Sequence, residues 1–347
     1  MYLNYIFFEG TQAGVIKMAP VIKEFENRGV AFRFICSGQH RSRSLKRTIE
    51  LFGLPEPESL TGSKKDVVNL AGLTTWAPKI MFKLVHDIPK DSVIITQGDS
   101  ITTFVGTLWA KYSRCKLAHI EAGMRSFDIF SPFPEELIRV FADCMSDYLF
   151  ASCDSAYKNI ERYYSRKKVV NMGANTLIDS MKLALKIGHN SFAIPDEPYT
   201  IVTLHRLETM MNREKLNRAL KIIEMVSKRM KVLFFMHDSI ASRIKRDIPG
   251  VEYNDFLEYT EFVNVLWHSE LVLTDSGGLQ EECYYLDKPC LLLRDVTEHG
   301  EGIGKNVCLG FSLREAEIFL RRPYHRPNPV DISISPSKLI AEVLLDA

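Results

Sequence analysis

The chain has 347 residues, of which 46% are hydrophobic and 25% are charged, a composition typical of a globular protein with room for two domains. Its 44 Lys and Arg residues balance 43 Asp and Glu residues, so no excess charge favours nucleic acid or a membrane surface as a partner. Seven cysteines without a close Cys-x-x-Cys pair argue against zinc and disulfides, and predict reduced thiols in the cytoplasm.

Short apolar runs alternate with amphipathic stretches along the first half of the chain. The first run lacks the basic leader of a signal peptide and is interpreted as a strand. Because helices separate the strands, right-handed crossovers and a parallel sheet covered on both faces are expected. Strands are predicted at 3–8, 32–36, 93–96, 117–120 and 148–151, and helices at 16–27, 44–52, 67–85, 102–112 and 135–143.

The second half repeats this alternation, and 172–174 interrupt the pattern between the halves. The prediction is an α/β protein with two Rossmann-like, doubly wound parallel-sheet domains that face a central cleft, at 1–172 and 173–334. A terminal helix at 335–347 follows, with packing on the first domain as one option. In the second half, strands are predicted at 199–203, 232–236, 271–275 and 289–293, and helices at 176–187, 214–228, 261–268, 279–286 and 336–345.

The segment 271–282 predicts a strand, a tight glycine turn and the start of a helix. Such a turn directs backbone N–H groups and the positive end of the helix dipole at one point, where Ser276, Gly277 and Gly278 would admit a phosphate. Glu281 and Glu282 are then expected in the first helical turn, facing sugar hydroxyls. A plain strand-to-helix turn is an equally acceptable interpretation of this segment alone.

Carboxylates follow the predicted strands of the first half. Asp99 and Glu121 come directly after two strands, and Glu135 begins a helix after Pro134. Converging carboxylates repel one another, which raises a carboxyl pKa and suits general acid–base catalysis. The simpler alternative is that these side chains satisfy helix N-termini.

Glycines and cations follow other strand ends. Gly10 to Gly14, with Lys17 one turn later, form a second candidate anion loop, or else an ordinary turn with a surface lysine. His205 and His237 follow two strands of the second half and could donate hydrogen bonds to a diphosphate. A metal site there is the poorer interpretation, because neither histidine has a closely spaced ligand partner.

Taken together and in this order, these segments resemble the UDP-N-acetylglucosamine 2-epimerase family. The resemblance is carried by a combination of short motifs, none of them decisive alone. They cover nearly the whole chain in collinear order, at 10–20, 38–40, 97–99, 119–125, 131–136, 173–179, 203–206, 274–282 and 294–298.

The resemblance implies a glycosyltransferase-B-like fold and an isomerase that acts on UDP-N-acetylglucosamine or a close relative. The proton at sugar carbon 2 is removed with anti elimination of UDP, and both groups return with inversion at that carbon to give the mannosamine epimer. A hydrolysing branch of the family instead releases N-acetylmannosamine and UDP. Neither chemistry needs a redox cofactor, and no cofactor or metal is expected. A cytoplasmic homodimer that supplies surface polysaccharide synthesis is the implied setting.

The resemblance also implies roles for individual residues. Acid–base catalysis would fall to Asp99, Glu121 and Glu135, and stabilisation of the departing UDP to His205. The UDP-sugar would contact a larger set of groups, in which Lys17 serves the phosphates and Glu282 the ribose: Gly10, Lys17, Arg125, His237, Ser276, Gly277, Gly278, Glu282 and Arg294.

The chain departs from the family pattern at two loops. The family's Arg-Pro-Glu after Gly-Thr is here Gln12-Ala13-Gly14, and a second Arg-Pro-Glu is His299-Gly300-Glu301. Each change removes an arginine, and glutamine at the first loop cannot replace the charge. Arg125, Arg206 or Arg294 could compensate. A glycosyltransferase of the same architecture and a non-catalytic nucleotide-sugar binder are the rival hypotheses, and Gly38-Gln39-His40 resembles a segment with regulatory contacts.

Overall fold

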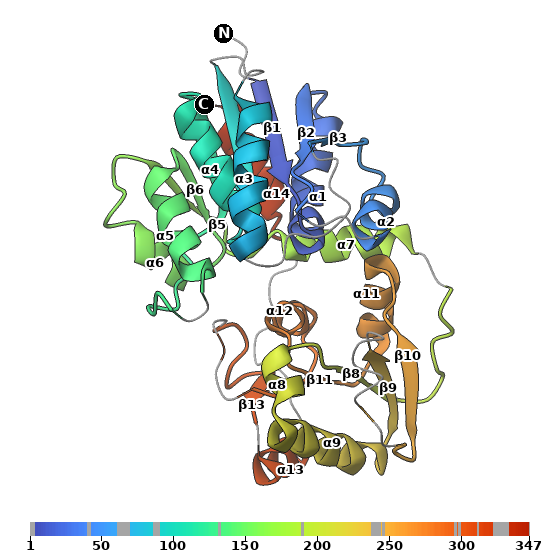
Figure 1. Ribbon diagram of the computed structural model, residues 1–347. Helices are drawn as coiled ribbons and strands as arrows, with labels where there is room; N and C mark the ends of the chain where they lie inside the picture. The colour runs from blue at the N-terminus through green and yellow to red at the C-terminus, as the bar shows by residue number, and fades with distance from the viewer. Residues whose placement is uncertain are drawn as a thin grey trace. The chain divides into compact units, whose positions relative to one another are not determined.

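The computed structural model comprises two compact units, one of Met1–Leu183 with Ser333–Ala347 and the other of Ala184–Ile332 (Figure 1). Both units are built on parallel sheets, as the alternation of strands and helices predicted. The structure describes residues 4–39, 43–60, 70–85, 91–130, 133–188, 191–236, 244, 247–294, 297, 300–310, 312–321 and 333–346.

The sheet of the first unit has seven parallel strands in the order β3-β2-β1-β4-β5-β6-β7. Strand order reverses between β1 and β4, and ligands of open parallel sheets bind at the carboxyl ends of strands beside such a switch. The strands are β1 (Asn4–Glu9), β2 (Phe32–Cys36), β3 (Glu58–Ser59), β4 (Ser92–Gln97), β5 (Lys116–Ala122), β6 (Tyr148–Ala151) and β7 (Lys168–Asn171).

Helices cover both faces of this sheet. Successive side chains of a strand point to opposite faces, so Phe8 packs against Trp109 of α4 with ring centroids 5.4 Å apart, whereas Phe7 packs against Phe25 of α1 at 5.1 Å. The helices are α1 (Gln12–Asn27), α2 (Arg43–Leu51), α3 (Leu70–Leu84), α4 (Ile101–Tyr112), α5 (Glu135–Met145), α6 (Asp154–Ile160) and α14 (Pro336–Leu345), with α7 (Leu177–Ile187) at the division between the units.

The C-terminal helix α14 belongs to the first unit, where it lies beside α1. The Tyr5 hydroxyl on β1 donates a hydrogen bond of 2.7 Å to the carbonyl of Leu344, and Arg28 pairs with Glu342 at 3.3 Å. The units divide inside α7, whereas the sequence predicted a boundary at 172, directly after β7. The exact domain boundary stays a prediction.

The sheet of the second unit has six parallel strands in the order β10-β9-β8-β11-β12-β13, and its order reverses between β8 and β11. On β8, Ile201 faces the core under α11 and α12, while Val202 faces the core under α9 and α13. The elements are β8 (Tyr199–Thr203), β9 (Lys231–Met236), β10 (Val251–Asp255), β11 (Leu271–Thr274), β12 (Cys290–Leu292), β13 (Val307–Leu309), α8 (Leu207–Met211), α9 (Arg213–Ser227), α11 (Tyr259–His268), α12 (Gly277–Leu286) and α13 (Leu313–Arg321).

Among the described residues, four strands and three helices escaped the sequence prediction. The strands β3, β7, β10 and β13 lie at the edges of the sheets, where they are short or incompletely buried and therefore lack a continuous apolar run. The helices α6, α8 and α13 have at most nine residues. All seven cysteines are free thiols. Within the described ranges, no helix is long and apolar enough to cross a membrane.

Candidate active site

The backbone of Glu121 is the most unusual feature at the strand ends of the first unit. Its φ of 73° lies in the left-handed region, which non-glycine residues rarely adopt, and the pairing of β5 with β6 shifts register between Ile120 and Ala122. Such a bulge turns a side chain out of the regular alternation of the strand. Gly123, with a φ of 83°, follows, and a Cβ there would lie 2.2 Å from the Ala156 carbonyl oxygen. The local sequence therefore needs glycine after Glu121.

Three donors from different parts of the first unit hold the Glu121 carboxylate. Lys17 of α1 lies 2.7 Å from Oε1, Asn175 donates to Oε1 at 2.9 Å, and Gln97 of β4 donates to Oε2 at 2.6 Å. The Glu121 side chain is only 11% exposed. Lys17, predicted as a phosphate contact, thus has a carboxylate partner within its own unit, and its contact with a phosphate stays a prediction.

Asp99 is held by an arginine that the sequence interpretation had not singled out. Arg139 of α5 donates to Asp99 Oδ2 from Nε at 2.9 Å and lies 2.6 Å from it through Nη2. Its Nη1 donates to Glu136 at 3.1 Å. The sequence spacing of Glu136 and Arg139 could have revealed this arginine. Residues three apart on a helix share a face, so Arg139 is expected beside Glu136 at the start of α5.

The structure brings the segments of Asp99 and Glu121 together. They follow the neighbouring strands β4 and β5, and a Cβ built at Gly98 would lie 3.3 Å from Glu121 Oε2. Glu135 begins α5, the helix that delivers Arg139 to Asp99, and its Oε2 is buried without a hydrogen-bond partner among the described residues. The sequence predicted that the three carboxylates would repel one another. This prediction is corrected for Asp99 and Glu121, because each of them pairs with a cation.

A buried cluster of charges lies behind these strand ends. His119 of β5 is 2.7 Å from Asp143 through Nδ1 and 2.8 Å from the Gly98 carbonyl through Nε2. The other Asp143 oxygen accepts hydrogen bonds from the Gly123 amide at 3.0 Å and from Arg125 at 2.6 Å. Asp143 is fully buried, and nothing in the sequence pattern distinguished it from other helix residues.

The pKa values of this pair diverge. Burial would lower the pKa of His119, but the hydrogen bond and charge of Asp143 outweigh burial and raise it above its ordinary value. Burial would raise the pKa of Asp143, but His119 and then Arg125 outweigh burial and lower this pKa overall. Arg125, predicted as a substitute cation for the substrate, is therefore partnered inside the first unit.

In the second unit, the ends of β8 and β11 lie side by side. The hydroxyls of Thr203 and Thr274 are 2.7 Å apart, and Ser276 caps α12 by accepting a hydrogen bond from the Leu279 amide at 3.3 Å. The first N–H groups of a helix have no intrahelical partner and carry the positive end of its dipole. Ser276, Gly277 and Gly278 thus begin a helix, as expected of a phosphate-type turn, and phosphate binding there stays a prediction.

Asp275 organises the opposite side of this turn. It is fully buried, and its carboxylate accepts hydrogen bonds from the amides of His205 at 3.1 Å and Arg206 at 3.0 Å. His205 Nδ1 lies 3.3 Å from the same carboxylate. Burial, followed by the charges of Arg206 and Arg294, lowers the pKa of His205 even though Asp275 opposes them. Arg206 and Arg294 therefore act electrostatically on a histidine beside the phosphate-type turn.

Known proteins match this chain over nearly its full length. The profile of the UDP-N-acetylglucosamine 2-epimerase family matches residues 23–319. The UDP-N-acetylglucosamine 2-epimerase of Methanocaldococcus jannaschii is 31% identical, covering 95% of this chain and 96% of the relative. The chain belongs to the UDP-N-acetylglucosamine 2-epimerase family.

Solved structures of the family share the fold. The crystal structure of UDP-GlcNAc 2-epimerase from Neisseria meningitidis bound to UDP-GlcNAc superimposes with a TM-score of 0.85 at 28% identity, covering 99% of this chain and 100% of the other. The enzyme of M. jannaschii in complex with UDP-GlcNAc and UDP gives 0.83 at 29% identity, with 99% and 100% coverage. The two parallel-sheet units therefore form the fold of the family, as predicted.

One departure from the family motif has a structural counterpart in Glu9. The carboxyl of Glu9 is fully buried at the end of β1 and accepts hydrogen bonds from the amides of Gly10 at 2.8 Å and Thr11 at 3.0 Å. A Cβ at Gly14, where the family motif has glutamate, would lie 2.2 Å from the Glu9 carboxyl carbon. Glu9 thus occupies the space of a side chain at position 14, and donors of the predicted anion loop point at it.

The acidic pair after the phosphate-type turn lies deeper in the helix than expected. Glu281 and Glu282 fall in the second turn of α12, not the first, because the helix already begins at Gly277. Glu281 accepts a hydrogen bond of 3.1 Å from the Tyr285 hydroxyl. Glu282, 7% exposed, contributes after burial to the raised pKa of Tyr259. Ribose binding by Glu282 stays a prediction, and His237, 298 and 299 lie outside the described residues.

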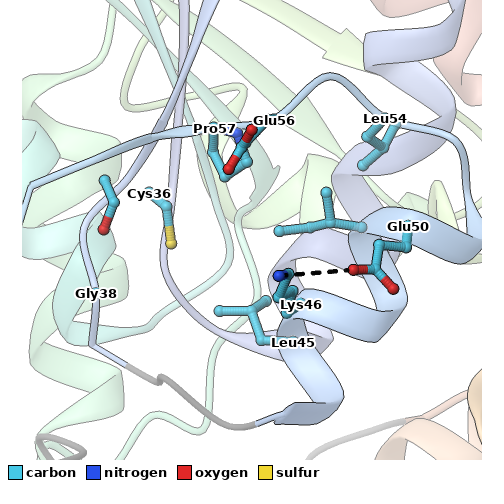
Figure 2. Close-up of a pocket in the computed structure, with 10 residues that line it drawn as sticks. Cys36, Gly38, Leu45, Lys46, Glu50, Leu54, Glu56 and Pro57 are labelled. Carbon is cyan, nitrogen blue, oxygen red and sulfur yellow. Dashed lines mark ion pairs between the residues drawn. The ribbon is translucent and has the colours of Figure 1, made fainter. Parts of the chain in front are cut away.

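The segment Gly38-Gln39-His40 resembles one with regulatory contacts in the family. In this structure Gln39 caps a helix, Gly38 lines a pocket, and His40 lies outside the described residues. The amide oxygen of Gln39 accepts hydrogen bonds from the Thr102 amide at 2.9 Å and hydroxyl at 2.8 Å, and thereby caps α4. Beside it, a pocket of about 540 Å³ opens between β2 and α2, with Lys46 and Glu50 3.9 Å apart (Figure 2). The described lining includes none of the candidate catalytic residues: Cys36, Gly38, Leu45, Lys46, Ile49, Glu50, Leu54, Glu56, Pro57 and Ser59.

The Glu9 carboxyl predicts a pH dependence of stability. Burial raises its pKa from 4.5 to about 7 despite the hydrogen bonds from Gly10 and Thr11. The stability that its protonated form contributes is full below pH 4.5 and is lost as the pH rises through about 7. Glutamine cannot ionise, so the free energy of unfolding of Glu9→Gln should not fall by this amount, about 3 kcal/mol, as the pH rises.

Urea unfolding of the wild type and of Glu9→Gln at pH 5 and pH 8 measures this effect. The difference in free energy of unfolding between the two proteins should shift in favour of Glu9→Gln at the higher pH. Glu252→Gln, at a side chain that is 47% exposed, controls for the loss of one carboxylate. A difference that does not change with pH would contradict the titration of Glu9.

Proposed function

We propose that this protein interconverts UDP-N-acetylglucosamine, or a close relative, and its mannosamine epimer. The supporting observation is the pair of strand-end carboxylates, Asp99 and Glu121, each held in a fixed position beside a cation. A relative named UDP-N-acetylglucosamine 2-epimerase matches 95% of the chain, and one solved relative carries UDP-GlcNAc.

In the proposed reaction, a carboxylate of the first unit removes the proton at sugar carbon 2 while the bond from carbon 1 to UDP breaks. The electron pair of the C–H bond forms the double bond of a 2-acetamidoglucal. UDP then returns to carbon 1, and a proton is added to carbon 2 from the opposite face. Asp99, Glu121 and Glu135 are the candidate acid–base groups. Fixed placement of such groups contributes to rate because the geometry is set before the reaction.

The second unit is proposed to hold UDP. The amides of Gly277 and Gly278 and the hydroxyl of Ser276 would bind the diphosphate, as helix N-termini bind phosphates generally. His205 and Arg294 would balance the charge of the departing UDP. Arg206 and Arg294 both lie near enough to His205 to lower its pKa. They are therefore the two candidate substitute cations that belong to the second unit, with His205.

The remaining contacts are part of the same proposal. Glu282 would accept hydrogen bonds from the ribose, and Gly10, Lys17, Arg125 and His237 would complete the UDP-sugar site. The hydrolysing outcome shares the first elimination and differs in that water adds to carbon 1 of the glucal. A cytoplasmic setting agrees with seven free thiols.

Proton NMR in heavy water tests the reaction. With UDP-N-acetylglucosamine, we expect UDP-N-acetylmannosamine with deuterium at carbon 2. Asp99→Asn and Glu121→Gln should each lower the exchange rate about 10² to 10⁴-fold, the usual effect of losing a general acid or base. Glu58→Gln, at an exposed edge-strand glutamate paired with Arg33, should leave the rate unchanged.

Other products would identify the rival functions. Free N-acetylmannosamine with UDP identifies the hydrolysing branch. UDP binding without exchange at carbon 2 would contradict epimerisation of this substrate and support a nucleotide-sugar binder. Sugar transfer to an acceptor that survives both carboxylate substitutions would instead support a glycosyltransferase.

UDP binding should take up a proton at His205. The pKa of His205 is low in the free protein because of burial and nearby arginines, and a bound diphosphate favours the imidazolium. Affinity for UDP should therefore fall as the pH rises between the pKa of the free and bound states, by at most about tenfold per pH unit. Isothermal titration in two buffers of different ionisation enthalpy measures the proton uptake.

The matched comparison is between His205→Asn and His268→Asn. The phosphate of UDP itself titrates near neutral pH and contributes equally to the proton uptake of the wild type and both variants. The measured quantity is therefore the difference in proton uptake between each variant and the wild type. His205→Asn should remove the extra proton, whereas His268→Asn, on the exposed end of α11, should retain it. Equal uptake in wild type and His205→Asn would contradict the role of His205.

We propose a homodimer formed through α5 of the first unit. Leu137 and Val140, three residues apart on this helix, are 50% and 42% exposed. Such a concentration of exposed apolar side chains marks an interaction surface, and a two-fold dimer is the commonest way to cover one. The segment before the helix also exposes large apolar side chains, at Phe127, Ile129, Phe130 and Phe133.

Light scattering after gel filtration tests the dimer. The wild type should have the mass of two chains, and the double change Leu137→Glu with Val140→Glu should give a folded monomer. Leu313→Glu, at a similarly exposed leucine of α13, should stay dimeric. A monomeric wild type, or a dimeric double variant, would contradict this interface.

A further inference from the structure

Both ring nitrogens of His119 face hydrogen-bond acceptors. Nδ1 lies 2.7 Å from a carboxylate oxygen of Asp143, and Nε2 lies 2.8 Å from the carbonyl oxygen of Gly98. A neutral imidazole carries one N–H and would direct a lone pair at one of these oxygens. With Asp143 ionised, as its lowered pKa indicates, two good hydrogen bonds require both ring protons, which makes the ring an imidazolium.

The charges around His119 support this protonation state. Asp143 of α5 faces Nδ1, and Glu121 on the same strand adds a second negative charge. Arg125, after β5, opposes them but is itself bound to Asp143 at 2.6 Å. On the β4 side, the group facing the ring is the Gly98 carbonyl. Lys17 pairs with Glu121 as Arg125 pairs with Asp143, so these charges balance, and the two acceptors in direct contact with the ring favour the imidazolium.

The imidazolium and its counter-ion are bonded to the backbone on both sides of the candidate catalytic carboxylates. His119 binds the carbonyl of Gly98, the residue before Asp99, where the backbone has a left-handed φ of 67°. Asp143 binds the amide of Gly123, two residues after Glu121. One buried ion pair thus fixes the end of β4 and the bulge of β5 together.

We propose that His119, as an imidazolium in the neutral pH range, and Asp143 form the positioning pair that holds Asp99 and Glu121 in register for catalysis. This role rests on the proposed epimerase function. Neither residue needs to touch the sugar, because each acts through the backbone of a strand end. A displacement of about 1 Å at a catalytic group can lower a rate about 100-fold, so rigid anchoring of both carboxylates has a direct effect on turnover.

Nitrogen NMR of the full-length protein with ¹⁵N-labelled histidine tests the protonation state without reference to activity. The signals of His119 are assigned by their loss in His119→Phe. We expect both ring nitrogens to be protonated at pH 7. In Asp143→Asn the counter-ion is lost, burial lowers the pKa, and the ring should be neutral at this pH. A neutral His119 in the wild type at pH 7 would overturn the proposal.

Steady-state kinetics tests the positioning role. His119→Phe keeps a planar aromatic ring but loses both donors, so kcat should fall about 100-fold with little change in KM. Asp143→Ala should do the same. Asp143→Asn can accept the Gly123 amide through its oxygen and donate to a neutral His119 ring through its nitrogen, which leaves the bond to Gly98 intact. Its kcat should therefore recover most of the loss.

Controls separate positioning from general destabilisation. Circular dichroism and the melting temperature identify variants that fail to fold, and His268→Phe on α11 controls for the loss of a histidine ring. Folded His119→Phe and Asp143→Ala with unchanged kcat would overturn the positioning role, as would Asp143→Asn no more active than Asp143→Ala. If the wild type turns over no nucleotide sugar, the proposed function fails, and the NMR result alone then decides the protonation of His119.

Discussion

The left-handed backbone at Glu121 is the constraint on which the first unit's site depends. Holding a non-glycine residue in this conformation costs about 1 to 3 kcal/mol, and it persists only where the surroundings require it. Here Lys17, Gln97 and Asn175 hold the side chain, and the Asp143 carboxylate holds the Gly123 amide after it. The bulge presents the carboxylate at the carboxyl ends of the sheet's strands, where ligands of such folds bind.

Compensation of buried charge is the second organising principle. Asp143 pairs with both His119 and Arg125, so this buried carboxylate carries no uncompensated charge into a low-dielectric interior, and the partly exposed Asp99 pairs with Arg139. Glu9 is different, because no cation among the described residues pairs with it and burial moves its pKa to about 7 instead. Carboxyl groups of one sheet are thus stabilised in different ways: some by a paired cation, and Glu9 by a raised pKa that favours its neutral form.

The departures from the family motif alter how the β1 turn is built. Gly14 leaves room for the Glu9 carboxylate, which accepts hydrogen bonds from the amides of Gly10 and Thr11. The turn is therefore capped by an internal acidic group. In the second unit, by contrast, Ser276 caps α12 with a hydroxyl that leaves no charge there, and the neighbouring His205 has a pKa lowered by burial and by Arg206 and Arg294. Anion binding is accordingly better supported in the second unit.

The sequence alone determined the fold class, most of the strands and helices and the family, because apolar periodicity and collinear motifs are local properties of the chain. It also placed Asp99 and Glu121 at neighbouring strand ends. Edge strands such as β10 were missed because a half-exposed strand lacks a continuous apolar run. Only the tertiary structure decided the partners of each charge. Arg139 and Asp143 are bonded to residues 40 and 24 positions away, and crossover packing of helices on the sheet, which no local pattern records, creates those contacts.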